Sequence, residues 1–361
     1  MQPTLNVLDL FSGCGGFSLG AHQAGLNVKL AVDIDPILTS SFRCNFPKTR
    51  LLLQDISTLE GRDVLGEIGP IDGIFGGPPC QAFSAMGHRR VDDPRRELLI
   101  HFFRLVSEIS PAFFVAENVQ GLQFKSSEDT LSRGLDYVRS KYQIVGPLLL
   151  NVADYGGATR RQRVFIIGLD PSRCEGLTID DVQRAETNPA TVRQAIGDLQ
   201  DATFLREYGS FDIWRINKKG RPSRYASEMR AANGEFTGHL PTAHTKQIVR
   251  RFAKVRAGEI DRIGRHPRLA WDGQCPTLRA GTGSDRGSYQ SVRPIHPSSN
   301  RVITVREAAR LQGFPDRFRF HPTVWHSFRM IGNSVSPIMA RALFGIISSK
   351  LIRPEYGVAA E

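Results

Sequence analysis

The first 170 residues alternate short apolar runs with amphipathic stretches. This rhythm is typical of parallel strands joined by helices that cover both faces of one sheet. Each run ends at glycine, proline or an acidic residue, which predicts strands over residues 5–11, 28–33, 71–75, 113–116 and 164–168. Because ligands of such sheets bind at the carboxyl ends of the strands, we expect an α/β fold with its site at that edge.

After residue 170 the rhythm gives way to a segment rich in glycine, arginine, histidine and proline, which extends to about residue 301 and has no clear period. Helical periodicity returns at residues 305–311, where Thr304 and Glu307 have the spacing of a capping box, and again at residues 336–351. We therefore predict a core of residues 1–170, a smaller inserted domain of residues 171–300, and a C-terminal segment, 301–361, that returns to the core.

The charge is unevenly placed along the chain. The formal net charge is +11, and residues 201–300 hold 18 Lys/Arg against 9 Asp/Glu. This excess of positive charge is explained either by a polyanionic partner such as nucleic acid or by a soluble protein whose surface is merely basic. No apolar run approaches the roughly 20 residues of a membrane span. The five scattered cysteines lack a C-x-x-C pair, so we expect a cytoplasmic protein without disulfides or a metal site.

A glycine-rich turn follows the first predicted strand and precedes a helix predicted over residues 17–24. Phe11 opens the turn, and Gly13, Gly15 and Gly16 let backbone N–H groups approach a ligand closely. Ser18 stands where a strict G-x-G-x-x-G pattern has its third glycine. The turn alone is therefore equally compatible with a tight bend that binds nothing.

Acidic residues after the next two apolar runs give the glycine turn a chemical meaning. Asp33 ends the second predicted strand about 20 residues after Gly13, where nucleoside-binding α/β folds hydrogen-bond ribose. Ile34 can pack on an adenine ring, and Asp55, followed by Ile56, can meet the adenine amino group. Each acid alone is compatible with a solvated loop or a helix cap, but together with the turn they favour an adenosine-type cofactor.

The strongest segment follows the strand predicted over residues 71–75. There the chain continues as Pro78-Pro79-Cys80-Gln81, and two consecutive prolines fix the backbone immediately before a cysteine. Such rigidity suits a sulfur that must be presented at one angle, whereas a lone cysteine is more often an inert thiol.

Pro78-Pro79-Cys80-Gln81 resembles the catalytic motif of the DNA cytosine C5-methyltransferases of bacterial restriction-modification systems. Further segments resemble that family's motifs in the same order: Asp9 to Gly16, Glu117-Asn118-Val119, residues 151–156, Arg161-Gln162-Arg163, residues 306–315 and Gly332-Asn333-Ser334-Val335. Two positions depart from the family pattern, because Thr159 and Met330 stand where glutamines are common. The basic middle falls where the family keeps its target-recognition domain.

The resemblance implies a fold, a cofactor and roles for particular residues. The fold is the Rossmann-like fold of methyltransferases that use S-adenosylmethionine and release S-adenosylhomocysteine. Cys80 attacks C6 of a flipped-out cytosine, Glu117 faces N3, Arg163 binds O2, and Arg161 steadies the loop or a flanking phosphate. The implied cofactor-binding residues are Phe11, Gly13, Gly15, Gly16, Asp33, Ile34, Asp55, Ile56, Pro78 and Asn333.

Double-stranded DNA is the expected partner. The basic, glycine-hinged residues 84–94 suit a loop that closes over DNA. The candidate DNA contacts are Gln81, Ser84, His88, Arg89, Arg250, Arg251 and Arg279, with His244, His266 and Arg286 as further candidates. We expect a monomer, with a cognate restriction endonuclease as a possible neighbour in the genome.

Three alternatives remain open at this point. A transfer-RNA cytosine methyltransferase shares the scaffold, but the long basic insertion and the missing Cys-Phe-Thr motif oppose it. A catalytically dead relative would serve as a binding module, which the intact Cys80 and Glu117 oppose. A nicotinamide-dependent dehydrogenase accounts for the glycine turn and Asp33, but it has no use for the Pro-Pro-Cys segment.

Overall fold

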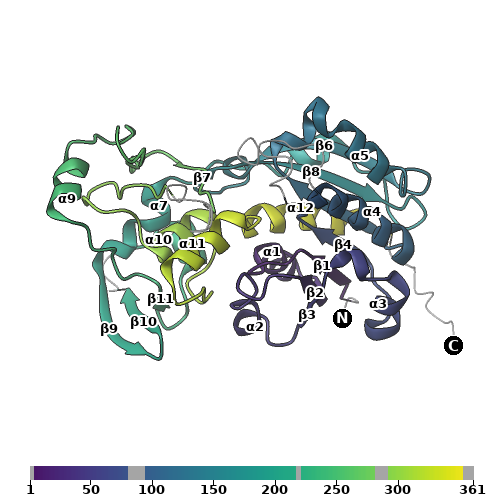
Figure 1. Ribbon diagram of the computed structural model, residues 1–361, viewed down its shortest axis with the longest axis horizontal. Coiled ribbons are helices and arrows are strands. Elements are labelled where there is room, and N and C mark those ends of the chain that lie inside the picture. Colours follow the sequence, from purple (N-terminus) through teal and green to yellow (C-terminus); the bar gives the residue numbers. More distant parts are fainter. Residues whose placement is uncertain (1–3, 80–93, 217–220, 281–291, 353–361) are drawn as a thin grey trace.

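The computed structural model describes residues 4–79, 94–216, 221–280 and 292–352, and within them the central sheet has seven strands (Figure 1). In sheet order these are β3 (Arg50–Leu53), β2 (Asn27–Asp33), β1 (Asn6–Leu10), β4 (Gly73–Gly76), β5 (Phe113–Asn118), β8 (Gln162–Leu169) and β6 (Gln143–Asn151). The pairs from β3 to β5 are parallel, whereas β8 runs antiparallel to β5 and β6. The expected mainly parallel α/β sheet is confirmed.

Helices cover both faces of the sheet because side chains alternate along each strand. Leu8 belongs to a core cluster with the helices α3 (Gly61–Ile68) and α4 (Glu97–Ile109), and α5 (Glu128–Leu135) packs on α4. Val7, which precedes Leu8 in β1, belongs to the cluster on the opposite face, with α1 (Gly16–Gln23), α6 (Ile179–Gln183) and α12 (Pro337–Ser349). The predicted helices at residues 17–24 and 336–351 are therefore present on one face.

Strand β6 was not among the predicted strands, and its burial explains why. Val145 is its single buried residue, since β6 lies at the edge of the sheet. The strand also contains Pro147, which sheets tolerate at an edge where no ladder hydrogen bond is required. An edge strand of this kind lacks the continuous apolar run that marked β1, β2, β4, β5 and β8.

The described residues between 190 and 334 form a second, smaller lobe beside the sheet, here called the small lobe (Figure 1). Its described part holds the antiparallel sheet β11 (Glu235–Thr237), β10 (Phe211–Ile216) and β9 (Ala202–Tyr208). Its helices are α7 (Val192–Ile196), α8 (Arg224–Met229), α9 (Lys246–Ala253), α10 (Val305–Gln312) and α11 (Val324–Asn333). A short parallel pair, β7 (Thr159–Arg160) with β12 (Cys275–Pro276), connects the two lobes.

The two lobes divide the chain differently from the expected boundaries. Residues just after 170 stay with the large sheet: Cys174 and Val182 lie in its core, and Glu175 N–H donates to the Lys350 carbonyl at 2.6 Å. Helices α10 and α11 lie in the small lobe because their apolar faces complete its core around α7 and β10. The chain returns to the large sheet at α12, and the predicted capping box of α10 is present.

Helices α11 and α12 together form a stretch, Val324–Ser349, that is long and apolar enough to cross a membrane by composition. Of its most apolar window 67% is buried inside the protein. The apolar side chains of α12 pack on the sheet beside α1, as expected for core helices of a globular fold.

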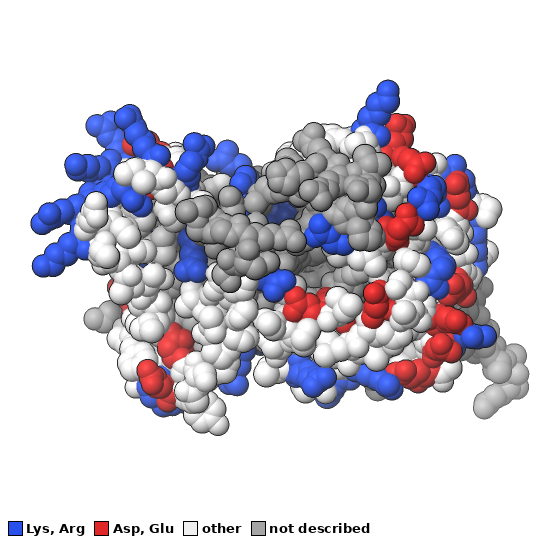
Figure 2. All heavy atoms as spheres, in the orientation of Figure 1, with Lys and Arg blue, Asp and Glu red and all other residues white. Residues whose placement is uncertain are grey.

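Basic side chains gather on the outer part of the small lobe. Between residues 246 and 268 the chain has eight Lys/Arg and two Asp/Glu. Figure 2 shows a dense group of Lys and Arg at the upper left, over the part of the small lobe that Figure 1 labels α9. The charge excess seen in the sequence is therefore concentrated on one surface.

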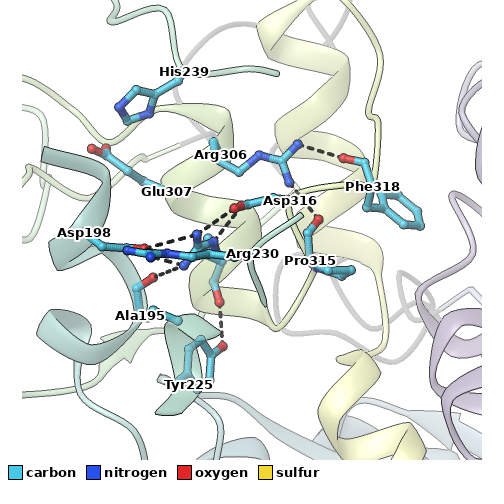
Figure 3. A network of polar contacts seen from close by, with 12 residues as sticks. Ala195, Asp198, Tyr225, Arg230, His239, Arg306, Glu307, Pro315, Asp316 and Phe318 are labelled. Atoms are coloured by element: carbon cyan, nitrogen blue, oxygen red, sulfur yellow. Dashed lines mark hydrogen bonds and ion pairs between the residues drawn. The ribbon is translucent and has the colours of Figure 1, made fainter. Parts of the chain in front are cut away.

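The small lobe is held together by buried ions (Figure 3). The Arg310 guanidinium donates to both carboxylate oxygens of Asp316 at 2.7 Å, and both side chains are fully buried. Asp198 bridges Arg310 and Arg230, and the Tyr225 hydroxyl donates to the Arg310 carbonyl at 2.6 Å. This network fastens α10 to α7 and α8 in one arrangement.

Replacing Asp316 by alanine is expected to lower the free energy of unfolding by about 3–5 kcal/mol, because it leaves the buried Arg310 without its bidentate partner. Urea unfolding followed by circular dichroism measures the loss. The control is Glu97→Ala, which breaks the exposed pair between Arg133 and Glu97 and should cost at most about 1 kcal/mol. Equal effects of the two substitutions would contradict a structural role for the Arg310–Asp316 pair.

Candidate active site

The glycine turn between β1 and α1 is shaped by positive backbone angles. Phe11, Gly13 and Gly15 have φ of 65°, 52° and 94°. A Cβ on Gly15 would lie 2.3 Å from the Phe46 ring, and one on Gly16 would lie 2.3 Å from Ser334 Oγ. Positions 15 and 16 therefore require glycine, and the turn is packed closely against the end of α11.

Asp33, at the end of β2, lies directly against this turn. One carboxylate oxygen accepts the Gly13 N–H and the other accepts the Asp35 N–H, both at 2.8 Å. Burial raises the pKa of Asp33 although these N–H groups oppose the shift. The next side chain, Ile34, is 65% exposed, which leaves an apolar surface available beside the carboxylate.

The other predicted cofactor residues lie at neighbouring strand ends. Asp55 caps the turn after β3 by accepting the Ser57 N–H at 2.8 Å, which lowers the pKa of Asp55, and Ile56 is buried below it. Asn333 is exposed at the last position of α11. Pro78 is buried after β4.

Two buried polar atoms near the turn have no hydrogen-bond partner among the described residues: Asp9 Oδ1 and Ser12 Oγ. The other oxygen of Asp9 accepts from the Ser18 hydroxyl, and burial raises the pKa of Asp9 well above its ordinary value. Unpaired polar atoms beside a glycine turn, Asp33 and an exposed Ile34 fit a ligand with both a polar chain and a nucleoside. The sequence prediction did not include Asp9 among the site residues.

Glu117 and Arg163 form an ion pair where β5 ends and the antiparallel β8 begins. Arg163 Nε lies 3.0 Å from Glu117 Oε1, and both side chains are mostly buried. Burial raises the pKa of Glu117, whereas the charges of Arg163 and then Arg161 oppose the rise. A carboxyl of this kind keeps its proton to a higher pH than an exposed glutamate does.

The Pro-Pro segment approaches this pair from the adjacent strand. A Cβ on Gly77 would lie 3.0 Å from Glu117 Oε2, and Asn118 Nδ2 donates to the Pro78 carbonyl at 3.3 Å. The end of β4 lies against Glu117 because β4 and β5 are neighbouring parallel strands, whose carboxyl ends meet at the same edge of the sheet. Cys80, Gln81, Ser84, His88 and Arg89 lie outside the described residues.

Arg161 has a different environment from the one expected for a phosphate contact. Its side chain is 1% exposed and donates to the carbonyls of Leu278, Gly332 and Ser334 at 2.9–3.1 Å. These internal partners agree with the loop-steadying role expected for Arg161, and its contact with a flanking phosphate stays a prediction. Arg161 joins β8 to the small lobe and to the carbonyls on both sides of Asn333.

The two departures from the family pattern are accommodated by internal contacts. The Thr159 hydroxyl donates to the Cys275 carbonyl at 3.1 Å, which ties β7 to β12. Met330 is buried, and its sulfur accepts from the Ser41 hydroxyl at 3.6 Å. Both residues therefore serve the packing between the lobes.

A polar cleft of about 470 Å³ opens beside Arg163. Its lining residues are Val119, Gln120, Asn151, Arg160, Gln162, Arg163 and Thr277. Val119, Asn151, Gln162 and Arg163 lie in motif segments named from the sequence, whereas Thr277 was missed because it comes from the small lobe and its spacing from Arg163 in the chain gives no sign of proximity. The cleft has donors and acceptors suited to a polar substrate.

The predicted DNA contacts in the small lobe fall into two groups. Arg250 and Arg279 are exposed. Arg251 is partly buried and pairs with Asp261 at 3.1 Å. His244 accepts the Val302 N–H and His266 bonds the Arg293 carbonyl, so both have internal partners, while Arg286 lies outside the described residues.

The chain has a mainly parallel sheet, a nucleoside-type loop after β1, and a buried glutamate that faces a Pro-Pro turn. These features and its structural neighbour place it among the Rossmann-like methyltransferases, which use an S-adenosylmethionine-type methyl donor. Within that class the chain belongs to the C-5 cytosine-specific DNA methylases, whose family profile matches residues 5–349. The profile covers both lobes. It favours DNA over the transfer-RNA alternative.

Individual relatives agree with this assignment. Type II methyltransferase M.XorII of Xanthomonas oryzae is 41% identical over 95% of this chain and 84% of its own length. Type II methyltransferase M.DdeI of Desulfomicrobium norvegicum is 33% identical over 95% and 88%. A prophage-encoded E. coli protein described as a DNA modification methyltransferase has a TM-score of 0.82 at 38% identity, covering 96% of this chain and 99% of its own.

Proposed function

We propose that this enzyme methylates C5 of a cytosine flipped out of a specific duplex sequence, with Cys80 as the nucleophile. The ion pair between Glu117 and Arg163 beside the Pro-Pro turn carries the proposal. It supplies an acid and a cation at the point where the chain enters Pro79-Cys80.

The chemistry of cytosine explains why this set of side chains is needed. C5 is a weak nucleophile until the Cys80 thiolate forms a bond to C6, which makes C5 an enamine carbon. The displaced electron pair moves toward N3 and O2. Glu117 gives or shares a proton at N3, and Arg163 stabilises the negative charge at O2. After methylation the C5 proton leaves, the C6–sulfur bond breaks, and Cys80 regains its electron pair.

The residues at the ends of β1, β2 and β3 fit S-adenosylmethionine, which supplies the electrophilic methyl group when bound. Asp33 would bind the ribose hydroxyls, Ile34 would cover the adenine, and Asp55 would meet its amino group. The glycine turn with Asp9 and Ser12 would receive the polar chain, beside Asn333 and Pro78.

The small lobe would contact DNA through its basic surface, with Arg250 and Arg279 on the duplex and phosphate contacts providing the affinity. Flipping the target base costs a few kcal/mol, which contacts on both lobes can offset. The Type II methyltransferase relatives support a role as the modification enzyme of a restriction-modification system. We further propose that the enzyme acts as a monomer on DNA in the cytoplasm or nucleoid, with a cognate endonuclease encoded nearby.

Bisulfite sequencing of DNA from cells that express the protein tests this function. We expect cytosines in one short duplex sequence to resist conversion, which identifies the DNA substrate and the sequence together. Cells expressing Cys80→Ala serve as the control and should show full conversion. Protection that ignores sequence, or methyl incorporation into transfer RNA without protection of DNA, would contradict the proposal.

A further inference from the structure

A small hairpin projects from the basic surface of the small lobe and carries an unusual side chain at its tip. Ile260 and Pro267 form an antiparallel bridge, and residues 261–266 make the turn between them. Ile263 lies at this tip with 76% of its surface exposed, the largest exposed fraction among the large hydrophobic side chains of the described residues. Arg262 and Arg265 flank it and are also exposed.

The turn is built to hold one conformation. Asp261 Oδ2 accepts the Gly264 N–H at 2.7 Å, its backbone N–H donates to the His266 carbonyl at 2.8 Å, and its carbonyl accepts the Arg265 N–H at 2.9 Å. A Cβ on Gly264 would lie 2.6 Å from the His266 ring, so glycine is required there. Arg265 adopts φ of 58°, a conformation that a non-glycine residue adopts when its surroundings impose it.

The base of the hairpin is equally fixed. The buried Arg268 guanidinium donates to the carbonyls of His296 and Phe252 at 2.9 and 2.7 Å, and to Asn300 Oδ1 at 2.8 Å. Arg251, on α9, pairs with Asp261 at 3.1 Å. The exposed isoleucine is therefore presented by a rigid support, which is how protein side chains that distinguish ligands are usually held.

The chemistry around Ile263 identifies what it contacts. The exposed arginines that flank it suit phosphates, and the ion pair of Asp261 with Arg251 places the hairpin against α9, the helix beneath the basic group of Figure 2. In the major groove of DNA the main apolar feature that differs between bases is the C5 methyl group of thymine. An exposed isoleucine flanked by two exposed arginines matches that feature in polarity and has cations beside it that suit the adjoining phosphates.

We propose that Ile263 reads the methyl group of a thymine in the recognition sequence, through the major groove, while Arg262 and Arg265 contact the adjoining phosphates. The inference rests on the proposed contact between the small lobe and DNA. The proposal names one residue that determines sequence specificity in the small lobe, whereas the amino-acid sequence does not reveal which bases that lobe reads.

Binding to duplexes that carry deoxyuridine in place of single thymines tests the proposal, because this change removes only the methyl group. Starting from the sequence found by bisulfite sequencing, fluorescence anisotropy gives Kd for each duplex. Wild-type protein should bind one substituted duplex about fourfold more weakly, the effect of one buried methyl group. Ile263→Ala should bind that duplex and the thymine duplex equally well, with an unchanged Tm because Ile263 is exposed.

The matched control is Ile260→Ala, which removes a 55% exposed isoleucine from the base of the same hairpin and should keep the fourfold preference. Retention of the thymine preference by Ile263→Ala, indifference of the wild type to every substitution, or a recognition sequence without thymine would each overturn the assignment.

Separate variants test the DNA contact on which the inference rests. Arg250, on α9, and Arg256, shortly after it, are both exposed on the basic surface. The double variant Arg250→Ala/Arg256→Ala should weaken binding to every duplex and reduce its salt dependence. Weakened binding with no role for Ile263 would reject the thymine contact and leave the DNA-binding surface intact. Unchanged binding would reject the surface and the inference together.

Discussion

A Cys80→Ala enzyme is expected to transfer methyl groups to duplex DNA on the order of 10⁵-fold more slowly than the wild type. Without the thiolate no bond forms to C6, so C5 of cytosine remains too weak a nucleophile to take a methyl group. Cys80→Ser should be nearly as slow, because a hydroxyl has a much higher pKa than a thiol and is a poorer nucleophile at neutral pH. Single-turnover incorporation of labelled methyl groups measures both losses.

The control for Cys80 is Cys44→Ala, which removes an exposed cysteine on α2 (Phe42–Asn45) and should leave the rate unchanged. A duplex containing 5-fluorocytosine provides an independent readout. Fluorine at C5 cannot leave as a proton does, so wild-type protein should accumulate a covalent adduct while Cys80→Ala forms none. Unchanged incorporation by Cys80→Ser would rule out the covalent mechanism.

Glu117→Gln is expected to slow methyl transfer by about 10²–10⁴-fold, the usual contribution of a positioned acid. The amide oxygen can still accept from Arg163, and the amide N–H can donate a hydrogen bond, but the amide is too weak an acid to transfer a proton to N3. Because burial raises the pKa of Glu117, the wild type should stay active to a higher pH than an ordinary glutamate allows, and then lose rate as pH rises through that pKa. Single-turnover rates across pH test this, and Glu117→Gln should lack the alkaline decline.

Stability provides a second test of the protonation of Glu117. A group whose pKa is raised by folding stabilises the protein fully below its unfolded pKa and loses that contribution as pH rises through the folded value. As pH increases, the wild type should therefore lose unfolding free energy relative to Glu117→Gln, so the difference between the two proteins shifts in favour of the variant. Glu67→Gln, which changes a surface partner of Arg50, should show no such trend. A constant difference between Glu117→Gln and the wild type would contradict a raised pKa.

Local sequence features were sufficient to predict the core of the fold. The strands β1, β2, β4 and β5 are mostly buried and therefore mostly apolar, and their ends are marked by the glycine turn, Asp33, the Pro-Pro segment and Glu117. The antiparallel direction of β8 could not be predicted, because hydrophobic pattern indicates burial and not direction. Direction matters here, since it is the start of β8 that places Arg163 beside Glu117.

Apart from α10, the elements of the small lobe were not predicted, because long-range contacts join segments that lie far apart in the chain. Arg310 meets Asp198 across more than a hundred residues, and Arg161 meets carbonyls of Leu278 and Gly332 from distant segments. The sequence left open whether Arg161 steadies the loop or contacts a phosphate, and only the tertiary structure showed its buried hydrogen bonds between the lobes. No local pattern distinguishes an arginine destined for solvent from one that will be enclosed.

By itself the sequence determined most strands of the sheet and the basic character of the middle segment, because each depends on residues that are close in the chain. The roles of Cys80 and Glu117 came from the family resemblance of their motifs and stay a proposal. Tertiary structure alone decided that Glu117 pairs with Arg163, that α10 and α11 complete the small lobe, and that Ile263 stands exposed on a rigid tip. These features depend on which distant segments come into contact. The free energies of burial and of ion pairing arise only from those contacts, so the local sequence does not reveal them.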